Sequence, residues 1–265
     1  LVGSEMCIRD SYYTLADAQA DKLDRVCRKV GLDTRPGQRF LDIGCGWGSL
    51  SLYAAEHFDA EVVGVTISRE QKAFIDERIA QRGLADRVEI RVQDYREIPD
   101  RPFDAVASLE MGEHVGEQNY ATYAQVLHDK VVPGGMVCVQ QMSRPEGKHP
   151  GGGPFIESFI APDMYMRPVE RTMQYLTDAG LRVDDVEEMA EHYVRTVDGW
   201  YDTFEKNWAR AVDLVGDEMA RVWRLYLVGG RMAFRDGRMG VEQITATRPL
   251  TSVSYTHLRA HETGR

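Results

Sequence analysis

The chain has 265 residues, of which 43% are hydrophobic and 28% are charged. This balance is typical of a globular protein with one large domain, or a domain with an elaborate cap. The formal net charge of −10 argues against nucleic acid as the main partner, because phosphate binding requires a basic face. The four cysteines include no CxxC pair and no metal-ligand spacing, so we expect no metal site and the reduced thiols of a cytoplasmic protein.

The sequence of the two ends predicts an origin different from that of the rest of the chain. A DNA string that encodes residues 6–11 has a reverse complement that can encode residues 252–257, and the string looks like a transposon-derived sequencing adapter. We therefore expect 1–11 and about 251–265 to be non-native scars, with a natural frayed terminus as the alternative. Residues 12–250 are then predicted to form a single domain.

Hydrophobic periodicity predicts alternating strands and helices in the first part of the chain. In chain order we expect helix 14–30, strand 39–43, helix 49–58, strand 61–65, helix 69–81, strand 88–92, strand 103–108, helix 120–131 and strand 136–140. This alternation predicts an α/β, doubly wound and mostly parallel sheet.

The amino-acid composition changes after the fifth predicted strand. Residues 143–162 are rich in Pro and Gly, which is typical of a mobile lid over a ligand. Beyond it we expect helix 169–179, strand 181–186, a mainly helical stretch 200–234 and a last, antiparallel strand 239–247. The prediction is a Rossmann-like class I methyltransferase fold: a seven-stranded sheet with helices on both faces and a helical and loop substrate cap. Its parts are a cofactor-binding core 36–143, a lid and cap 144–238 and the last strand 239–248.

A glycine loop follows the first predicted strand. Gly44, Gly46 and Gly48 let the chain turn tightly and bring its backbone close to a ligand at a helix N-terminus. Such loops serve NAD, FAD and S-adenosylmethionine, or only strand–helix packing. A dinucleotide enzyme would carry an acidic residue at the end of the second strand, where this chain has residues 66–68, Thr-Ile-Ser. Asp42 instead ends the first strand, which favours S-adenosylmethionine.

Further cofactor contacts are expected at the ends of the next strands. Asp94, with Gln93 and Tyr95, follows the third strand and is placed to meet the adenine edge. The full predicted set is Asp42, Gly44, Cys45, Gly46, Trp47, Gly48, Thr66, Ser68, Gln71, Gln93, Asp94 and Tyr95.

Six segments carry a resemblance to a known family. They are LDIGCGWG at 41–48, VGVTISREQ at 63–71, QDYR at 93–96, EHVG at 113–116, AEHY at 190–193 and GVEQ at 240–243. With them the chain resembles the cyclopropane fatty acid synthases, which include the mycolic acid cyclopropane synthases, over 13–249. The resemblance implies S-adenosylmethionine at the carboxyl ends of the strands and a hydrophobic channel for an acyl chain. It also implies a bicarbonate ion, held near the transferred methyl as the base.

Carried over by position, the resemblance implies three catalytic residues. Glu113 matches the glutamate that holds the bicarbonate, Tyr193 matches a tyrosine of the same pocket, and Gln140 replaces the pocket histidine. We expect the family's pocket cysteine segment, which precedes Tyr13, to be missing, and Gly230 replaces a cysteine of the last helix. The anion pocket is therefore predicted to be altered. The alternatives are that Glu113 only caps a helix, that His114 beside it is structural and that Tyr193 is an unremarkable loop residue.

The expected reaction is methyl transfer to the double bond of an unsaturated acyl chain of a phospholipid. It passes through a carbocation to a cyclopropane or a methylene or methyl branch, and aromatic faces can stabilise that cation. Candidates to line that region, unless they only pack the core, are Tyr165, Trp200, Tyr201, Phe204 and Trp208. We expect peripheral contact with the cytosolic membrane face. The alternatives are a small soluble acceptor, or a catalytically silent protein that binds the cofactor or lipid.

Overall fold

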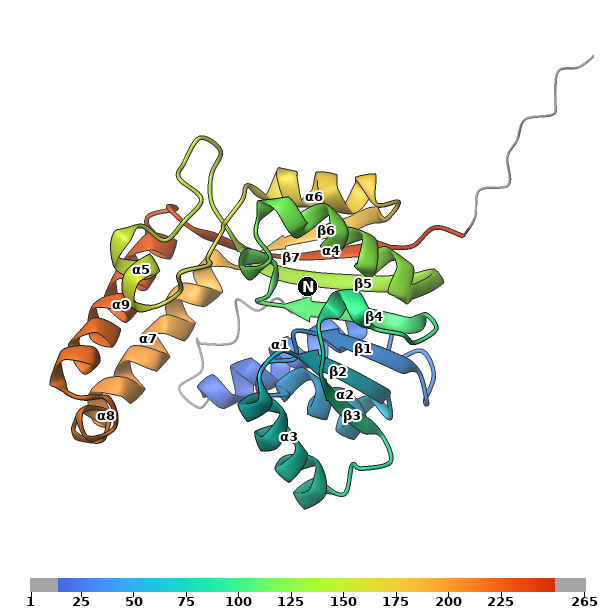
Figure 1. Ribbon diagram of the computed structural model, residues 1–265, viewed down its shortest axis with the longest axis horizontal. Helices are drawn as coiled ribbons and strands as arrows, with labels where there is room; N and C mark the ends of the chain where they lie inside the picture. The colour runs from blue at the N-terminus through green and yellow to red at the C-terminus, as the bar shows by residue number, and fades with distance from the viewer. Residues whose placement is uncertain (1–13, 251–265) are drawn as a thin grey trace, which may run out of the picture.

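The computed structural model describes residues 14–250, so the predicted scars at 1–11 and 251–265 lie outside the described residues. Its centre is one seven-stranded sheet with the order β3-β2-β1-β4-β5-β7-β6 (Figure 1). The strands are β1 (Arg39–Ile43), β2 (Glu61–Thr66), β3 (Val88–Val92), β4 (Phe103–Leu109), β5 (Val131–Ser143), β6 (Arg182–Glu188) and β7 (Gly240–Thr247). Strands β1 to β5 pair in parallel, whereas β7 runs antiparallel to both β5 and β6. The predicted fold class is confirmed.

Helices cover both faces of the sheet (Figure 1). On one face, α1 (Leu15–Lys29), α2 (Ser49–Phe58) and α3 (Arg69–Arg82) bury an apolar core against β1, β2 and β3. On the other face, α4 (Glu117–Lys130) and α6 (Val169–Asp178) bury a second core against β4 and β5. Since parallel strands buried on both faces need apolar side chains on each side, strands such as β4 read as continuous hydrophobic runs.

A helical cap extends beyond the ends of β5 and β7 (Figure 1). It consists of α5 (Pro154–Phe159), α7 (Ala190–Lys206), α8 (Trp208–Val215) and α9 (Asp217–Arg235). Tyr193 and Val197 of α7 pack with Phe234 of α9 and Val241 of β7 in a third apolar cluster. Across residues 14–250, no helix combines the length and the hydrophobicity needed to cross a membrane.

Three expectations about these elements were wrong in extent. Helix α4 begins at Glu117, three residues before the expected start, because Gly116 at φ 75° turns the chain into it without a side-chain cap. Strand β5 spans 131–143 instead of 136–140, with a register shift opposite Phe103. The cap is helical from Ala190, so Tyr193 lies on a helix and not in a loop: Tyr193 and Val197, one turn apart, form its buried face. The predicted lid also contains the short helix α5.

Candidate functional site

The glycine turn after β1 has a backbone that only glycine adopts easily. Gly44, Gly46 and Gly48 have φ values of 73°, 53° and 80°. The backbone N–H groups of Gly44 and Cys45 both donate to the carbonyl of Val65, each at 3.0 Å, which fixes the turn to β2. A Cβ at Gly44 would lie 2.7 Å from Met111 Sδ, and one at Gly48 would lie 2.8 Å from Ile75. The turn therefore packs closely against Met111 and Ile75, and the backbone of Gly44 and Gly46 borders an adjacent open space.

That space is a cavity of about 520 Å³ at the carboxyl ends of β1, β2 and β4, here called the cofactor cavity. Seven of the twelve predicted cofactor residues line it: Gly44, Gly46, Thr66, Gln71, Gln93, Asp94 and Tyr95. Leu109, Glu110, Met111, His114 and Asp163 close its other side. His114 pairs with Asp163 at 3.1 Å, as expected of a structural residue.

The other five predicted cofactor residues do not line this cavity. Asp42 is buried at the end of β1 and accepts a hydrogen bond from Ser51 at 2.7 Å, and burial raises the pKa of its carboxyl to about 6. Ser68 caps α3 by accepting from the backbone of Gln71. Trp47 is 56% exposed and meets Phe74 edge to face. Cys45 and Gly48 belong to the turn itself, where Cys45 is buried.

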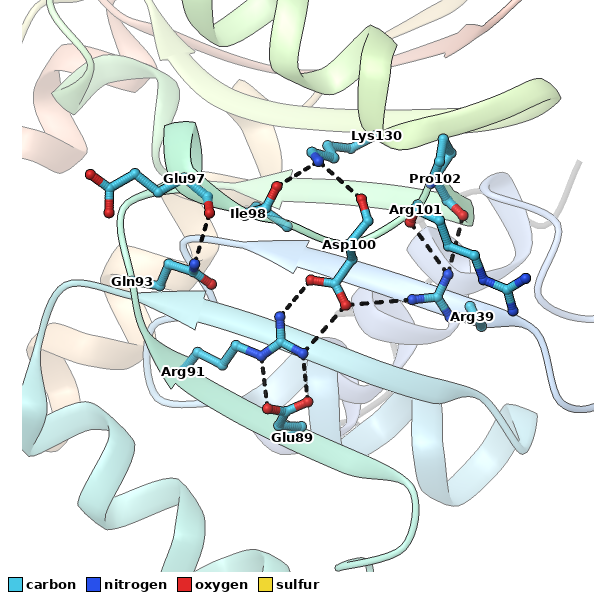
Figure 2. A network of polar contacts seen from close by, with 10 residues as sticks. All are labelled: Arg39, Glu89, Arg91, Gln93, Glu97, Ile98, Asp100, Arg101, Pro102 and Lys130. Atoms are coloured by element: carbon cyan, nitrogen blue, oxygen red, sulfur yellow. Dashed lines mark hydrogen bonds and ion pairs between the residues drawn. The ribbon is translucent and has the colours of Figure 1, made fainter.

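The loop after β3 is held rigidly where it borders the cofactor cavity. Figure 2 shows Asp100 between Arg91, at 2.5 Å, and Arg39, at 3.7 Å, while Lys130 donates to the carbonyls of Ile98 and Asp100. In the same view Gln93 Nε2 donates to the Glu97 carbonyl at 2.9 Å.

Two side chains of this loop, Gln93 and Asp94, line the cofactor cavity and differ in their capacity to bind an adenine. Gln93 Oε1 is buried without a hydrogen-bond partner in the described part of the chain, so it is a ready acceptor at the cavity. The Asp94 carboxylate, in contrast, accepts from the Arg96 backbone and guanidinium, and these bonds lower its pKa. With the glycine turn, the orphaned Gln93 oxygen makes the cavity fit a nucleoside cofactor of the S-adenosylmethionine type.

A second, mainly apolar cavity of about 240 Å³ lies between the lid and the cap. Its walls come from the end of β5, the segment 152–166, α7 and α9, and include Met142, Phe155, Ile156, Met166, Tyr193, Trp200, Tyr226, Leu227 and Phe234. Of the five aromatic candidates, only Trp200 lines it. Phe204 and Trp208 instead pack edge to face with each other. We call this space the apolar cavity.

The three predicted catalytic residues come together where the two cavities approach each other. Gln140 Nε2, near the end of β5, donates to Tyr193 Oη at 2.9 Å. Glu113, on a single 3-10 turn (Gly112–His114), is 1% exposed, and its Oε2 lacks a hydrogen-bond partner among the described residues. Burial, and then the charge of Glu110, raises the pKa of Glu113 well above its usual range. Tyr193 lines the apolar cavity, so this cluster borders it.

Glu110 is the residue that sequence reasoning missed. Its carboxylate accepts from Gln140 Nε2 at 2.5 Å and from the hydroxyl of Tyr193, and it also lines the cofactor cavity. The available signal was its position: an acidic side chain directly follows a buried strand, at the edge of the sheet where ligands bind.

A chain of hydrogen bonds fixes the orientation of the Gln140 amide. Gln243 of β7 lies opposite Gln140 in the sheet and donates to its Oε1 at 2.8 Å. Lys29 of α1 donates to Gln243 Oε1 at 2.8 Å and to Glu187 at 2.6 Å. Lys29 can only donate, so it fixes the oxygen of Gln243 on its side and leaves the Gln243 nitrogen to face Gln140. The Gln140 oxygen accepts from that nitrogen, so the Gln140 nitrogen faces Glu110 and Tyr193. In residues 14–250, no cluster of His, Cys, Asp and Glu is arranged to hold a metal ion.

Similar curated proteins include lipid-modifying enzymes. A probable fatty acid methyltransferase of Pseudomonas putida is 39% identical over 248 residues, which is 91% of this chain and 62% of that protein. The cyclopropane-fatty-acyl-phospholipid synthase of Escherichia coli K12 is 34% identical, with 88% of this chain and 59% of that protein covered. The chain thus spans about 60% of the length of these two relatives.

Solved structures share the fold. Mycolic acid cyclopropane synthase CmaA1, complexed with SAH and CTAB, is 27% identical with a TM-score of 0.81, covering 88% of this chain and 85% of that one. MmaA2 from Mycobacterium tuberculosis has a TM-score of 0.84 at 24% identity, covering 91% and 88%. The family model for mycolic acid cyclopropane synthetase matches residues 6–244. The chain therefore belongs to the mycolic acid cyclopropane synthetase family.

Proposed function

We propose that this protein transfers a methyl group from S-adenosylmethionine to the double bond of an unsaturated acyl chain of a phospholipid. One observation carries the proposal: a cavity with polar side chains under a glycine turn and an apolar cavity approach each other at a hydrogen-bonded pair, Glu110 and Tyr193. A cofactor and an alkyl chain would each find matching chemistry, and their reacting ends would meet at this pair. The core 36–143 would then serve the cofactor, 144–238 the lipid, and the last strand 239–248 would join the two.

The residues of the cofactor cavity suit the parts of S-adenosylmethionine. Bound there, the cofactor supplies a methyl group on a cationic sulfur, which the electron pair of an alkene can take up. The turn at Gly44 and Gly46 leaves room for the amino-acid part, near the buried Asp42. Thr66, with Gln71, lies beside the expected ribose position, and the unpaired Gln93 oxygen suits an adenine amine.

The apolar cavity suits an alkyl chain that carries an isolated double bond. Such an alkene is a weak nucleophile, so catalysis depends on holding it against the methyl group in a dry space. The resulting carbocation would face the rings of Tyr193, Tyr226 and Phe234 and the Glu110 carboxylate. Aromatic faces and a fixed negative charge both stabilise a developing cation.

Glu110, Tyr193 and Gln140 do not fit the additional bicarbonate ion that the family resemblance implies. The Tyr193 hydroxyl donates its one hydrogen bond to Glu110, and Gln140 Nε2 donates to both Glu110 and Tyr193. A second anion would meet the Glu110 carboxylate without a free donor from these side chains. The pocket is thus altered, and the placement of the base decides between a cyclopropane and a methylene branch.

We propose further that the protein works at the cytosolic face of a membrane. With a net charge of −10, attraction to anionic lipid is weak unless apolar side chains insert. Helices α8 and α9 expose Leu214 at 73%, Leu225 at 63% and Val215 at 47%. These three residues, here called the apolar patch, lie on helices of the cap that encloses the apolar cavity. Arg210 and Arg224 lie on the same two helices, and Arg224 is paired with Glu205.

The test is incubation of the protein with methyl-labelled S-adenosylmethionine and dioleoyl-phospholipid vesicles, followed by mass spectrometry of the acyl chains. We expect label in the chains as an added methylene unit. Label only in added small soluble acceptors would refute the lipid assignment. Cofactor binding without any transfer would favour a silent binding protein.

A further inference from the structure

Glu110 has a backbone conformation that an unconstrained glutamate avoids. It follows β4 directly, at φ 56°, and Asp59 is the only other non-glycine residue with positive φ among residues 14–250. The left-handed conformation costs a residue with a Cβ about 1–2 kcal/mol. Its N–H donates to the Gln140 carbonyl at 2.7 Å, so the sheet fixes the conformation. Such local strain is often found at functional sites because the surrounding structure maintains it.

The carboxyl group of Glu110 is surrounded by hydrogen-bond donors. Two different groups, the amide nitrogen of Gln140 and the hydroxyl of Tyr193, donate to the same oxygen, Oε1. The hydrogen-bond chain from Lys29 through Gln243 prevents the Gln140 amide from turning its oxygen toward Glu110. Oε1 of Glu110 is therefore held as an acceptor between two donors, which is the arrangement that best stabilises a carboxylate.

We propose that the Glu110 carboxylate is the base of the reaction and takes the place of a dissolved anion such as bicarbonate. The proposal rests on the methyl transfer proposed above. Glu110 lines the cofactor cavity and is bonded to Tyr193, which lines the apolar cavity. It is therefore a carboxylate that belongs to the chain and stands between the two reactants.

The proposed step balances without another reactant. After methyl transfer the acyl chain carries a carbocation next to the carbon that bears the new methyl group. Glu110 takes a proton from that methyl group, and the electron pair of the broken C–H bond closes the ring onto the cationic carbon. If a hydride shifts first, the same proton loss gives a methylene branch. Glu110, now a carboxylic acid, releases the proton to water through the cofactor cavity.

The charges around Glu110 agree with this division of roles. Burial, with the charge of Glu110, raises the pKa of Glu113 well above its usual range, which favours the neutral form of Glu113. Burial also raises the pKa values of Tyr193 and Tyr226, which keeps both hydroxyls protonated. Burial lowers the pKa of Lys22, and the charge of Glu110 opposes that shift.

Two substitutions of Glu110 test the proposal in the full chain. Glu110→Gln keeps the shape and removes the base, so we expect labelled methyl transfer to lipid to fall at least about 100-fold, the usual size of a general-base contribution. Glu110→Gly suits the positive φ and opens a space beside Tyr193 and Gln140. We expect it to be equally inactive in carbonate-free buffer, to melt no lower than the unchanged protein, and to regain activity when formate or bicarbonate is added.

A binding measurement separates this proposal from the proposed function. By ¹³C NMR, labelled bicarbonate should bind Glu110→Gly and leave the unchanged protein and Glu110→Gln unaffected. Bicarbonate binding by the unchanged protein, or turnover that stops in carbonate-free buffer and returns on addition, would overturn the role of Glu110. Wild-type activity in Glu110→Gln would do so as well. Absence of labelled lipid with every variant, including the unchanged protein, would instead refute the methyl transfer itself.

Discussion

The glycine turn allows fold and ligand binding to be perturbed separately. Gly46 and Gly48 both have positive φ, at 53° and 80°, so alanine at either position carries the left-handed penalty of about 1–2 kcal/mol. At Gly48 the new Cβ would also lie 2.8 Å from Ile75 in the core, which adds an overpacking cost of about 1–3 kcal/mol. At Gly46 it meets no atom within 4 Å and adjoins the cofactor cavity.

We therefore expect opposite rankings in two assays. In urea titrations followed by tryptophan fluorescence, Gly48→Ala should lose about 1–3 kcal/mol more unfolding free energy than Gly46→Ala. In calorimetric titration with S-adenosylmethionine, Gly46→Ala should lose at least about tenfold in affinity, or about 1.4 kcal/mol, because its methyl group occupies ligand space. Equal losses of stability, or normal binding by Gly46→Ala, would refute this account of the turn.

Three further outcomes follow from buried and exposed charges and from the apolar patch. Burial raises the pKa of Asp42 from 3.8 to about 6, so the contribution of Asp42 to the unfolding free energy falls as pH rises from about 4 to 6. Over that interval Asp42→Asn should gain about 2 kcal/mol of unfolding free energy relative to the unchanged protein in urea titrations, and parallel curves would contradict this. Arg167 is fully buried and Arg171 is exposed, although both pair with Glu117. Arg167→Met should therefore lose about 3 kcal/mol or more of unfolding free energy, and the control Arg171→Met under about 1 kcal/mol. Leu214→Asp on the cap should reduce sedimentation with anionic vesicles, whereas Leu250→Asp, equally exposed at 73% but beside Gly134 near the start of β5, should not. Equal effects of the two substitutions would exclude membrane contact through the apolar patch.

The sequence predicts the centre of the sheet well because strands such as β1 and β4 are buried on both faces. Strand β1 was predicted with its observed bounds, since an apolar run that ends in a glycine loop has few alternative conformations. The start of α7 could not be read in the same way. It has no side-chain cap, and its buried face is defined by contacts with α9, which lies far along the chain.

The site was predictable only in part. Gln140 and Tyr193 were named, and they do meet, but the resemblance that named them says nothing about Glu110. The positive φ of Glu110 is imposed by its pairing with the β5 backbone, and its partners come from β5 and α7. Such a residue is found only when three distant segments are placed together, because its own neighbours, Leu109 and Met111, give no local signal.

The place of β7 in the sheet has a consequence for synthesis on the ribosome. Among residues 14–250, strand β6 pairs only with β7, and the outer edge of β5 is covered by the same strand, over residues 240–247. Until residues 240–247 leave the exit tunnel, β5 and β6 each have an edge whose backbone N–H and C=O groups are unpaired. Exposed edges of this kind invite association with other nascent chains. Slowing translation just before residue 240 should therefore lower the yield of native protein more than an equal pause near residue 150, before β6 is made.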